Sequence, residues 1–394
     1  MNTIQSPVMP LVPTDEERLM REAVTGIASG YGAAYLRRCN EEGVPPTELW
    51  DALSAKGYTG VNIPAEYDGG GGGMTELAAV AEELGAAGCP LLLMVVSPAI
   101  AGSVLVRHGS AEQKDRWLRG IGTGTTKIAF AITEPDAGTN SHNLSTTATR
   151  RDDGSYAIRG QKTFISGVED ADALLVVTKT GTHTESGRGL LSLFIVDTDA
   201  PGLTRQEIPT APRGADKQWT LFFDDVVVEP DRLIGAEHHG LAVVFDGLNP
   251  ERIMTAALAV GAARRALAQA ADYARERVVW SAPIGSHQGI SHPLAQCKIE
   301  LELAALMTRK ACALYDGGFK GAGEASNMAK YAAAEAAIRC VDQAIQTHGG
   351  NGVAEEYGLS DMWWGVRTMR IAPVSREMIL NYVAEHSLGL PRSY

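Results

Sequence analysis

The segment KIAFAITEPDAGTN, residues 127–140, marks a change in the pattern of the sequence. Before it, at residues 47–56 and 76–87, apolar residues recur at helical spacing. From residue 127 onward they alternate with polar residues as in strands, and turns rich in Gly, Asp and Asn separate the runs. Similar alternating runs cover residues 155–166, 173–180, 190–196 and 219–228. This pattern predicts a helical region followed by a small antiparallel β region.

Helical spacing returns after residue 235. It predicts helices at residues 251–280, 292–315 and 323–348, and a shorter fourth helix after Pro373. The small residues in their seams favour a close-packed four-helix bundle. The predicted fold class is α+β, with an N-terminal helical domain (residues 1–125), a middle antiparallel β-barrel domain (126–236) and a C-terminal helical bundle domain (237–394).

Composition excludes some partners. The 394 residues include 35 Lys and Arg against 47 Asp and Glu, a net charge of −12, whereas a general nucleic-acid binder needs a basic face. Residues 86–106 carry no charge, but Pro90 and Pro98 interrupt them, which favours a buried helix over membrane insertion. The five cysteines are dispersed, without metal-ligand spacing, and the N-terminus does not resemble a signal peptide. We therefore expect a cytoplasmic protein that binds no metal.

Five segments are candidates for a ligand site or its frame. The segment at residues 131–140 ends a strand in a turn with free backbone N–H groups and hydroxyls. The glycines of QTHGGNG, residues 346–352, permit close approach to a phosphate or ribose. The others are GQKTFISG (160–167), FFDDVVVEPDRLIG (222–235) and RERVVWSAPIGSHQ (275–288). Taken singly, each segment also fits an ordinary turn, a core aromatic residue or an Arg that compensates a helix dipole.

In this order and at this spacing, the five segments resemble the acyl-CoA dehydrogenases over nearly the whole chain. These flavoenzymes form a double bond next to a thioester. The resemblance implies FAD as cofactor and an acyl-CoA, or an acyl chain on a carrier protein, as substrate. It also implies electron transfer to an electron-transferring flavoprotein or a similar acceptor, and a homotetramer in which part of each flavin site comes from a neighbouring subunit.

The resemblance also assigns individual residues, most of them to the flavin. The flavin contacts are Phe130, Ile132, Thr133, Gly138, Thr139, Phe164, Ser166, Arg277, Trp280, Gln288, Gln346, Gly349, Gly350, Ser375 and Glu377. Substrate contacts are Thr139, Asn249 and Arg252. The chain departs from the family pattern in several places, with Phe164 in the position of a Trp and Trp280 in that of a Phe.

The catalytic base is the largest departure. Dehydrogenation requires a carboxylate that removes the α-proton of the thioester. In most of the family this Glu lies in a Tyr-Glu-Gly-Thr-like loop, but residues 370–384 (RIAPVSREMILNYVA) lack that loop, and Ser375 falls at its Thr. A minority, including the isovaleryl- and long-chain-specific enzymes, carry the base at the position of Glu251. We therefore expect Glu251 to be the base; the alternatives are Glu377 and the absence of a conventional base. A Glu in the first turn of a helix can also merely favour the helix dipole.

Two other functions stay open at this point. A flavin monooxygenase or oxidase on the same scaffold would react with oxygen and would need no α-carbon base. A non-catalytic subunit of a heteromeric dehydrogenase would be active only with its partner.

Overall fold

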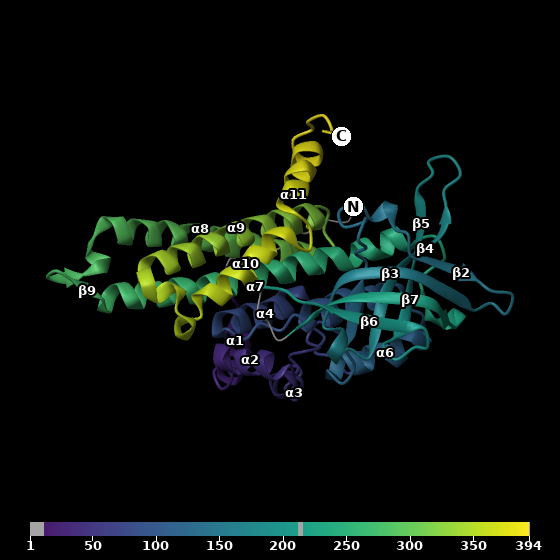
Figure 1. The fold of residues 1–394 in the computed structure, drawn as a ribbon, viewed down its shortest axis with the longest axis horizontal. Helices are drawn as coiled ribbons and strands as arrows, with labels where there is room; N and C mark the ends of the chain where they lie inside the picture. The colour runs from purple at the N-terminus through teal and green to yellow at the C-terminus, as the bar shows by residue number, and fades with distance from the viewer. Residues whose placement is uncertain (1–11, 212–215, 394) are drawn as a thin grey trace, which may run out of the picture. The chain divides into compact units, whose positions relative to one another are not determined.

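The computed structural model describes residues 12–211 and 216–393. Most of the N-terminal stretch that was compared with a signal peptide, residues 1–11, lies outside this part of the chain. The chain forms two compact units, and helices α2 and α7 contribute to both (Figure 1). The first unit contains Met1–Ala33, Gly73–Pro90 and Arg252–Tyr394, and the second contains Ala34–Gly72 and Leu91–Glu251.

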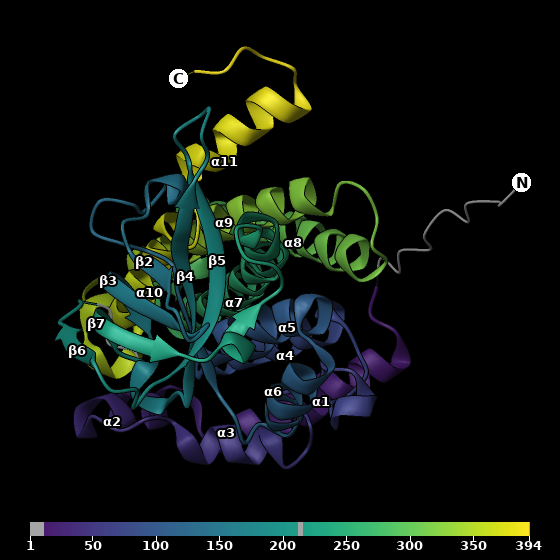
Figure 2. The ribbon, with the colours of Figure 1, turned by 90° about the vertical axis from the view of Figure 1, so that its right-hand side faces the viewer.

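The second unit is built on an eight-stranded sheet (Figure 2). Its strands are β1 (Ile128–Ala131), β2 (Thr147–Arg150), β3 (Tyr156–Ser166), β4 (Ala173–Thr182), β5 (Gly189–Asp197), β6 (Leu203–Ile208), β7 (Gln218–Val228) and β8 (Leu233–Ile234). The order is β6-β7-β3-β2-β4-β5-β8, and β1 pairs in parallel with β4. Within the described residues no pairing joins β6 to β8. The predicted β region is therefore confirmed, whereas closure into a barrel stays a prediction.

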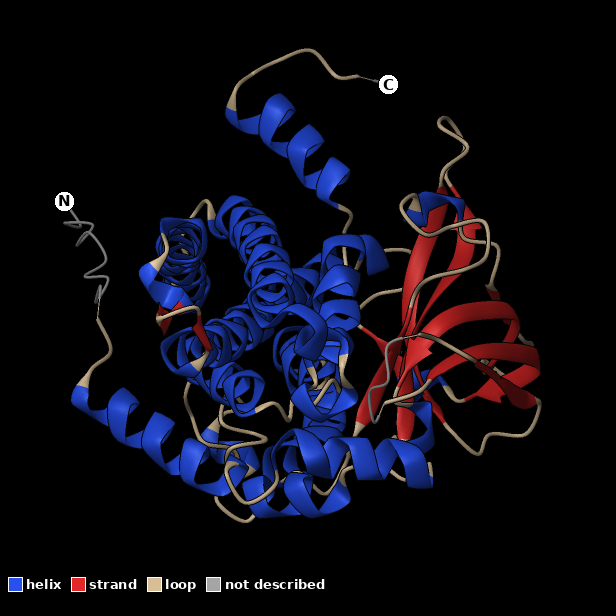
Figure 3. Cartoon of the chain, turned by 60° about the vertical axis from the view of Figure 1, so that its left-hand side comes forward, coloured by secondary structure: helices blue, strands red, loops and turns tan. Residues whose placement is uncertain are grey.

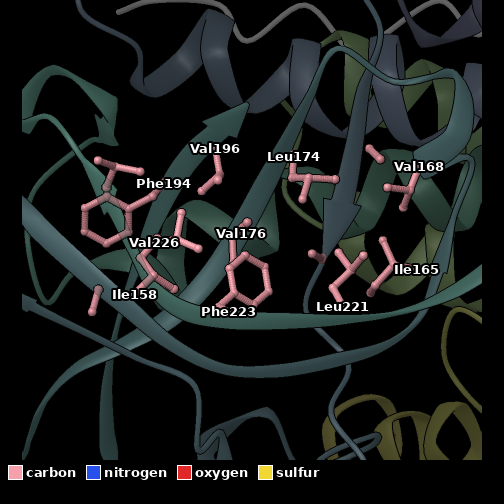
Figure 4. Packing of buried hydrophobic residues seen from close by; sticks show 14 of the residues in the cluster. Ile158, Ile165, Val168, Leu174, Val176, Phe194, Val196, Leu221, Phe223 and Val226 are labelled. Carbon is pink, nitrogen blue, oxygen red and sulfur yellow. The ribbon is translucent and has the colours of Figure 1, made fainter. Parts of the chain in front are cut away.

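Alternation of apolar residues along the strands produces the core of this sheet (Figure 4). Val176 of β4 and Phe194 of β5 are fully buried, as are Ile158 of β3 and Val226 of β7. The ring of Phe194 also packs on Tyr156, with 4.8 Å between the ring centroids. This core holds the strands that carry the first two candidate segments.

Helices complete the second unit. They are α3 (Thr47–Ser54), α5 (Ser103–His108), α6 (Ala111–Thr123), the π-helical segment η2 (Val95–Gly102) and most of α2 (Gly32–Glu42). The uncharged stretch at residues 86–106 includes η2, all of whose residues are buried, so the expected buried helix is confirmed. Within residues 12–211 and 216–393, no helix is long and apolar enough to cross a membrane.

The first unit is helical except for one short hairpin (Figure 3). Its elements are α1 (Asp15–Ala28), α4 (Met74–Ala87), β9 (Val278–Val279), β10 (Ala282–Pro283), α8 (Gln288–Asp316), α9 (Ala322–His348), α10 (Leu359–Ile371) and α11 (Arg376–Tyr382). Helices α8 and α9 pack along one another, and α10 packs on α9. The sequence did not predict α10, because only Leu359 and Val366 of its 13 residues are buried and its apolar stripe is short.

Helix α7 (Gly240–Glu276) differs from the helix predicted at residues 251–280. It begins 11 residues earlier and continues through Pro250. Proline removes one helical hydrogen bond, but contacts inside the second unit hold the turns that precede Pro250. Asp246 pairs with Arg107 at 2.8 Å and with His108 at 2.6 Å. A Cβ atom on Gly247 would lie 2.9 Å from the side chain of Ile100, which shows how closely α7 approaches η2.

The five-glycine run covers residues 69–73, and its first four glycines belong to the second unit, where they are closely packed. The N–H groups of Gly70, Gly71 and Gly72 donate to the carbonyls of Gly60, Ile63 and Val61 at 2.9–3.0 Å. A Cβ atom on Gly69 would lie 2.2 Å from the carbonyl oxygen of Ile63. The absence of side chains here allows two backbone segments to meet.

Candidate functional site

The ends of strands β1 and β3 lie side by side in the second unit. Phe130 is buried in β1, and Ile132 and Thr133 follow it half-buried. The backbone N–H of Thr163 donates to the carbonyl of Thr133 at 2.9 Å, and Lys162 Nζ donates to the carbonyl of Ile132 at 2.9 Å. These two hydrogen bonds join residues of the first two candidate segments into one edge, which we call the strand edge (residues 130–133 and 162–166).

Phe164 faces away from the core at this edge. The register between β3 and β7 shifts between Lys162 and Ile165, and Phe164 at that point has a φ of +55°. Its side chain is 60% exposed although it is a large apolar residue. A positive φ costs a residue with a side chain about 1–2 kcal/mol, and such strain is concentrated at ligand sites. The strand edge therefore offers an aromatic face to a planar ligand. Beside it, Ser166 Oγ donates to Gln218 Oε1 at 3.0 Å.

A tight turn follows Thr133. The N–H groups of Glu134 and Ala137 donate to each other's carbonyls at 3.3 and 3.1 Å. Gly138 and Thr139 lie just beyond the turn and are exposed. A Cβ atom on Gly138 would contact nothing within 4 Å, so a ligand could approach its backbone closely.

A second group of predicted residues lies at the end of α7 in the first unit. Trp280, at the turn of the β9–β10 hairpin, has a φ of +60° and is 95% exposed. Arg277 and Gln288 are exposed as well. The N–H of Ile284 donates to the carbonyl of Arg277 at 2.8 Å, which closes the hairpin. Within this unit, none of these three side chains is covered by the described residues.

The Gly349-Gly350 turn lies beside the end of α7. Both glycines are exposed, and a Cβ atom on either would contact nothing within 4 Å. Helix α9 ends at His348, whose ring stacks on Tyr273 with 4.3 Å between centroids. Asn351 Nδ2, just after the turn, donates to the hydroxyl of Tyr273 at 3.2 Å. Gln346 lies in the last turn of α9. The structure thus places the fifth candidate segment against Tyr273, two residues before the fourth segment begins.

Asn249, Glu251 and Arg252 lie in the first half of α7 and are half-buried. Glu251 is the last residue of the second unit, and Arg252 is the first residue of the following segment of the first unit. The expectation that Glu251 occupies the first turn of its helix is wrong, because the helix begins at Gly240. Stabilisation of the positive end of a helix dipole therefore does not explain this Glu.

Ser375 and Glu377 belong to a different part of the first unit from the glycine turn. Ser375 caps α11, because its Oγ accepts a hydrogen bond from the N–H of Met378 at 3.3 Å. The Glu377 side chain is 73% exposed and lies 3.6 Å from Arg376. The loop before α11 is held by the buried Lys330 of α9, whose Nζ donates to the carbonyl of Val374 at 2.6 Å. Lys330 precedes His348 by 18 residues, which is about 27 Å along a helix.

Two charged residues at or next to the strand edge, Lys162 and Glu134, were not predicted. Lys162 and Glu134 form a buried ion pair with 2.8 Å between Nζ and Oε1. Both lie within segments that the sequence analysis had already quoted. Nothing in the sequence indicates that these two residues are buried together. The Lys lies on a strand in which apolar and polar residues alternate, and the Glu lies next to a Pro in a turn.

The sequence models of the acyl-CoA dehydrogenase family match successive parts of the chain. The N-terminal domain model matches residues 14–125. The middle domain model matches residues 129–226, and the C-terminal domain model matches residues 238–388.

Individual proteins are similar over almost the full length. Acyl-CoA dehydrogenase FadE12 of Mycobacterium tuberculosis is 53% identical over 384 residues, which cover 97% of this chain and 98% of the relative. The structure of glutaryl-coenzyme A dehydrogenase in complex with glutaryl-CoA has a TM-score of 0.92 at 28% identity and covers 98% of both chains. The FAD complex of PigA has a TM-score of 0.89 at 27% identity, over 97% of this chain and 100% of that one.

Proposed function

The chain belongs to the acyl-CoA dehydrogenase family, and we propose that it catalyses the FAD-dependent α,β-dehydrogenation of an acyl-CoA. A carboxylate of the chain removes the α-proton, and bound FAD accepts the β-hydrogen as hydride. The similar proteins include one bound to glutaryl-CoA and one bound to FAD.

The observation that carries this proposal is the strand edge. Its backbone ends are joined by hydrogen bonds, and Phe164 presents a 60% exposed ring there at the expense of a strained φ. An isoalloxazine ring is planar and largely apolar, so it fits against such a face. Thr133, just after β1, and Ser166, at the end of β3, carry half-buried hydroxyls that would bind the polar atoms of the ring.

Glu251 is the base in this proposal. A catalytic carboxylate gains basicity where substrate excludes water. Glu251 is half-buried in the first half of α7, whereas the Glu377 carboxylate is 73% exposed beside Arg376. Water therefore reaches the Glu377 carboxylate more freely than that of Glu251. Asn249 and Arg252, next to Glu251, and Thr139 would contact the acyl-CoA.

The second group of flavin residues leads us to propose that the protein forms a homo-oligomer. We propose a homotetramer. Arg277, Trp280, Gln288 and the glycines of the turn are exposed in a single chain. An Arg guanidinium and open backbone at adjacent glycines suit a pyrophosphate. These groups would bind the nucleotide end of a flavin whose ring lies on another subunit, so Gln346, Gly349 and Gly350 would complete a shared site.

The proposal also covers the electron acceptor, the compartment and the domains. We assign the electrons to an electron-transferring flavoprotein or a similar acceptor. All five cysteines are buried free thiols, which suits a reducing cytoplasm. We also retain the division into domains at residues 1–125, 126–236 and 237–394, and the barrel closure of the middle domain.

An anaerobic titration tests the proposed reaction. The purified flavoprotein is mixed with a panel of acyl-CoA thioesters of different length and branching, and the flavin absorbance near 450 nm is followed. We expect one class of thioester to bleach the flavin. No bleaching with any thioester, together with turnover that requires oxygen, would instead identify an oxidase or monooxygenase.

The base is tested by Glu251→Gln. We expect this variant to slow bleaching by about 10²–10⁴-fold, because general-base catalysis contributes this much, while the flavin stays bound. Glu302→Gln, which removes an exposed carboxylate of α8, is the control and should bleach at the wild-type rate. Wild-type bleaching by Glu251→Gln, with slow bleaching by Glu377→Gln, would transfer the role to Glu377.

A further inference from the structure

The ion pair of Lys162 and Glu134 is isolated from water. The Lys162 side chain is 0% exposed and that of Glu134 is 2% exposed. Lys162 Nζ donates to Glu134 Oε1 at 2.8 Å and to the carbonyl of Ile132 at 2.9 Å. Removing two charges from water costs several kcal/mol per ion. A pair at this position therefore needs further partners to be retained.

Glu134 has those partners. Its carboxylate also accepts hydrogen bonds from the N–H and the hydroxyl of Ser145, at 2.6 and 2.7 Å, and from the N–H of Thr146 at 3.0 Å. Burial alone would raise the pKa of Glu134, but Lys162 and these donors lower it to about 2. Burial lowers the pKa of Lys162 to about 8, against the attraction of Glu134. Both groups are charged at neutral pH, and their charges cancel.

The pair contacts the strand edge directly, since Lys162 belongs to that edge and Glu134 follows Thr133. Lys162 holds the carbonyl of Ile132, the residue before Thr133, and it precedes Phe164 by two residues. We infer that Lys162 and Glu134 are positioning residues for the flavin ring, and that the balance of their two charges sets the reduction potential of the bound flavin. This inference rests on the proposed function only in that the strand edge receives the flavin.

Charge distinguishes this role from a structural one. A positive group near a flavin ring favours the reduced form, and a negative group opposes it. Glu134→Gln removes the attraction that opposes the lowering of the Lys162 pKa by burial, so the unbalanced cation is retained at acidic pH and lost as the pH rises. The potential should therefore rise relative to wild type at pH 6, and this difference should shrink at higher pH. Lys162→Met leaves the Glu134 anion unbalanced, so the potential should fall. If the pair only held β1 against β3, both variants would loosen the same edge and would shift the potential in the same direction or not at all.

The experiment measures the reduction potential of the intact holoprotein with xanthine, xanthine oxidase and a reference dye under anaerobic conditions. We expect shifts of opposite sign, each about tenfold in the reduction equilibrium, which is about 30 mV for a two-electron couple. The double variant Lys162→Met/Glu134→Gln, in which no charge remains, should return to within about threefold of wild type.

A second ion pair on the same strand gives the matched control. Arg159 of β3 pairs with Asp225, but their side chains are 68% and 47% exposed. Water screens such a pair, so Arg159→Met and Asp225→Asn should leave the potential unchanged. If Lys162→Met does not fold, Glu134→Gln decides alone, since a rise at pH 6 supports the inference and no rise at that pH overturns it. Shifts of the same sign in the two single variants would also overturn it.

The two proposals can fail separately. Reduction by xanthine oxidase needs no acyl-CoA, so the potentials are measurable even if no thioester bleaches the flavin. Conversely, bleaching by a thioester stands whether or not the potentials move. A purified chain that retains no flavin would overturn both.

Discussion

The two groups of proposed flavin residues are built in opposite ways. The strand edge of the second unit is fixed by a fully buried ion pair and by the hydrogen bond from Thr163 to Thr133. The hairpin and glycine turn of the first unit present side chains such as Trp280, which is 95% exposed. One group is thus held by contacts within a single chain, and the other lacks a covering surface among the described residues.

Because of this difference, mutations in the two groups should separate effects on folding from effects on assembly. Changes in the ion pair should destabilise the chain itself, because they disturb buried charge. Changes on the hairpin should leave the fold intact and affect only what binds there. The following predictions test this contrast in order of decreasing effect.

The largest effect is expected for Lys162→Met. Removing one partner of a buried ion pair leaves an unpaired buried charge, which typically costs about 3–5 kcal/mol of unfolding free energy. Urea unfolding followed by circular dichroism measures this change. Arg159→Met, at the exposed pair on the same strand, should change stability by no more than about 1 kcal/mol. A loss below that value for Lys162→Met would show that the ion pair does not fix the strand edge.

Trp280→Ala is expected to have the converse effect. An aromatic contact contributes about 0.5–1.5 kcal/mol, so flavin should dissociate up to about tenfold more readily, while urea unfolding of the flavin-free protein stays unchanged. Flavin fluorescence on dilution of the holoprotein measures the dissociation. Leu19→Ala, which removes a 66% exposed side chain of α1, is the control for loss of exposed apolar surface. A destabilised flavin-free protein would contradict the contrast.

The smallest expected effect is the loss of unfolding free energy at acidic pH. The pKa of Glu134 is lowered from 4.5 to about 2. Its stabilising contribution is therefore fully present above pH 4.5 and decreases as the pH falls toward 2. Between pH 6 and pH 4 the loss should be about 1 kcal/mol. Urea unfolding of wild type and Glu134→Gln at both pH values measures it, and the stability advantage of wild type should shrink at pH 4. An advantage that stays constant would mean that Glu134 does not carry this stabilisation.

Much of the fold could be predicted because local pattern and tertiary packing agree. The strands at residues 155–166 and 219–228 correspond to β3 and β7 within one residue at each end. Helix α7 could not be bounded, since the contacts of Asp246 and Gly247 that carry it through Pro250 come from residues more than 100 positions away. Short strands such as β8 and the weakly buried α10 lack a periodic signal.

The candidate site divides in the same way. Motif positions such as Phe164 and Gly349 could be selected from the sequence, and the structure gives both a positive φ. The partnership of Lys162 with Glu134 could not, because 28 residues separate them along the chain and only the fold brings them together. The half-buried position of Glu251 likewise depends on where α7 begins, which the sequence does not show.

The glycine run has a practical consequence for protein engineering. A stretch of five glycines would ordinarily be chosen for insertion of a tag or a reporter peptide, since such sequences usually serve as flexible linkers. Here the N–H groups of Gly70, Gly71 and Gly72 are all bonded to backbone carbonyls, and Gly69 has no room for a side chain. The exposed turn at residues 183–188, where Gly187 has no neighbour near a Cβ position, is the better insertion point.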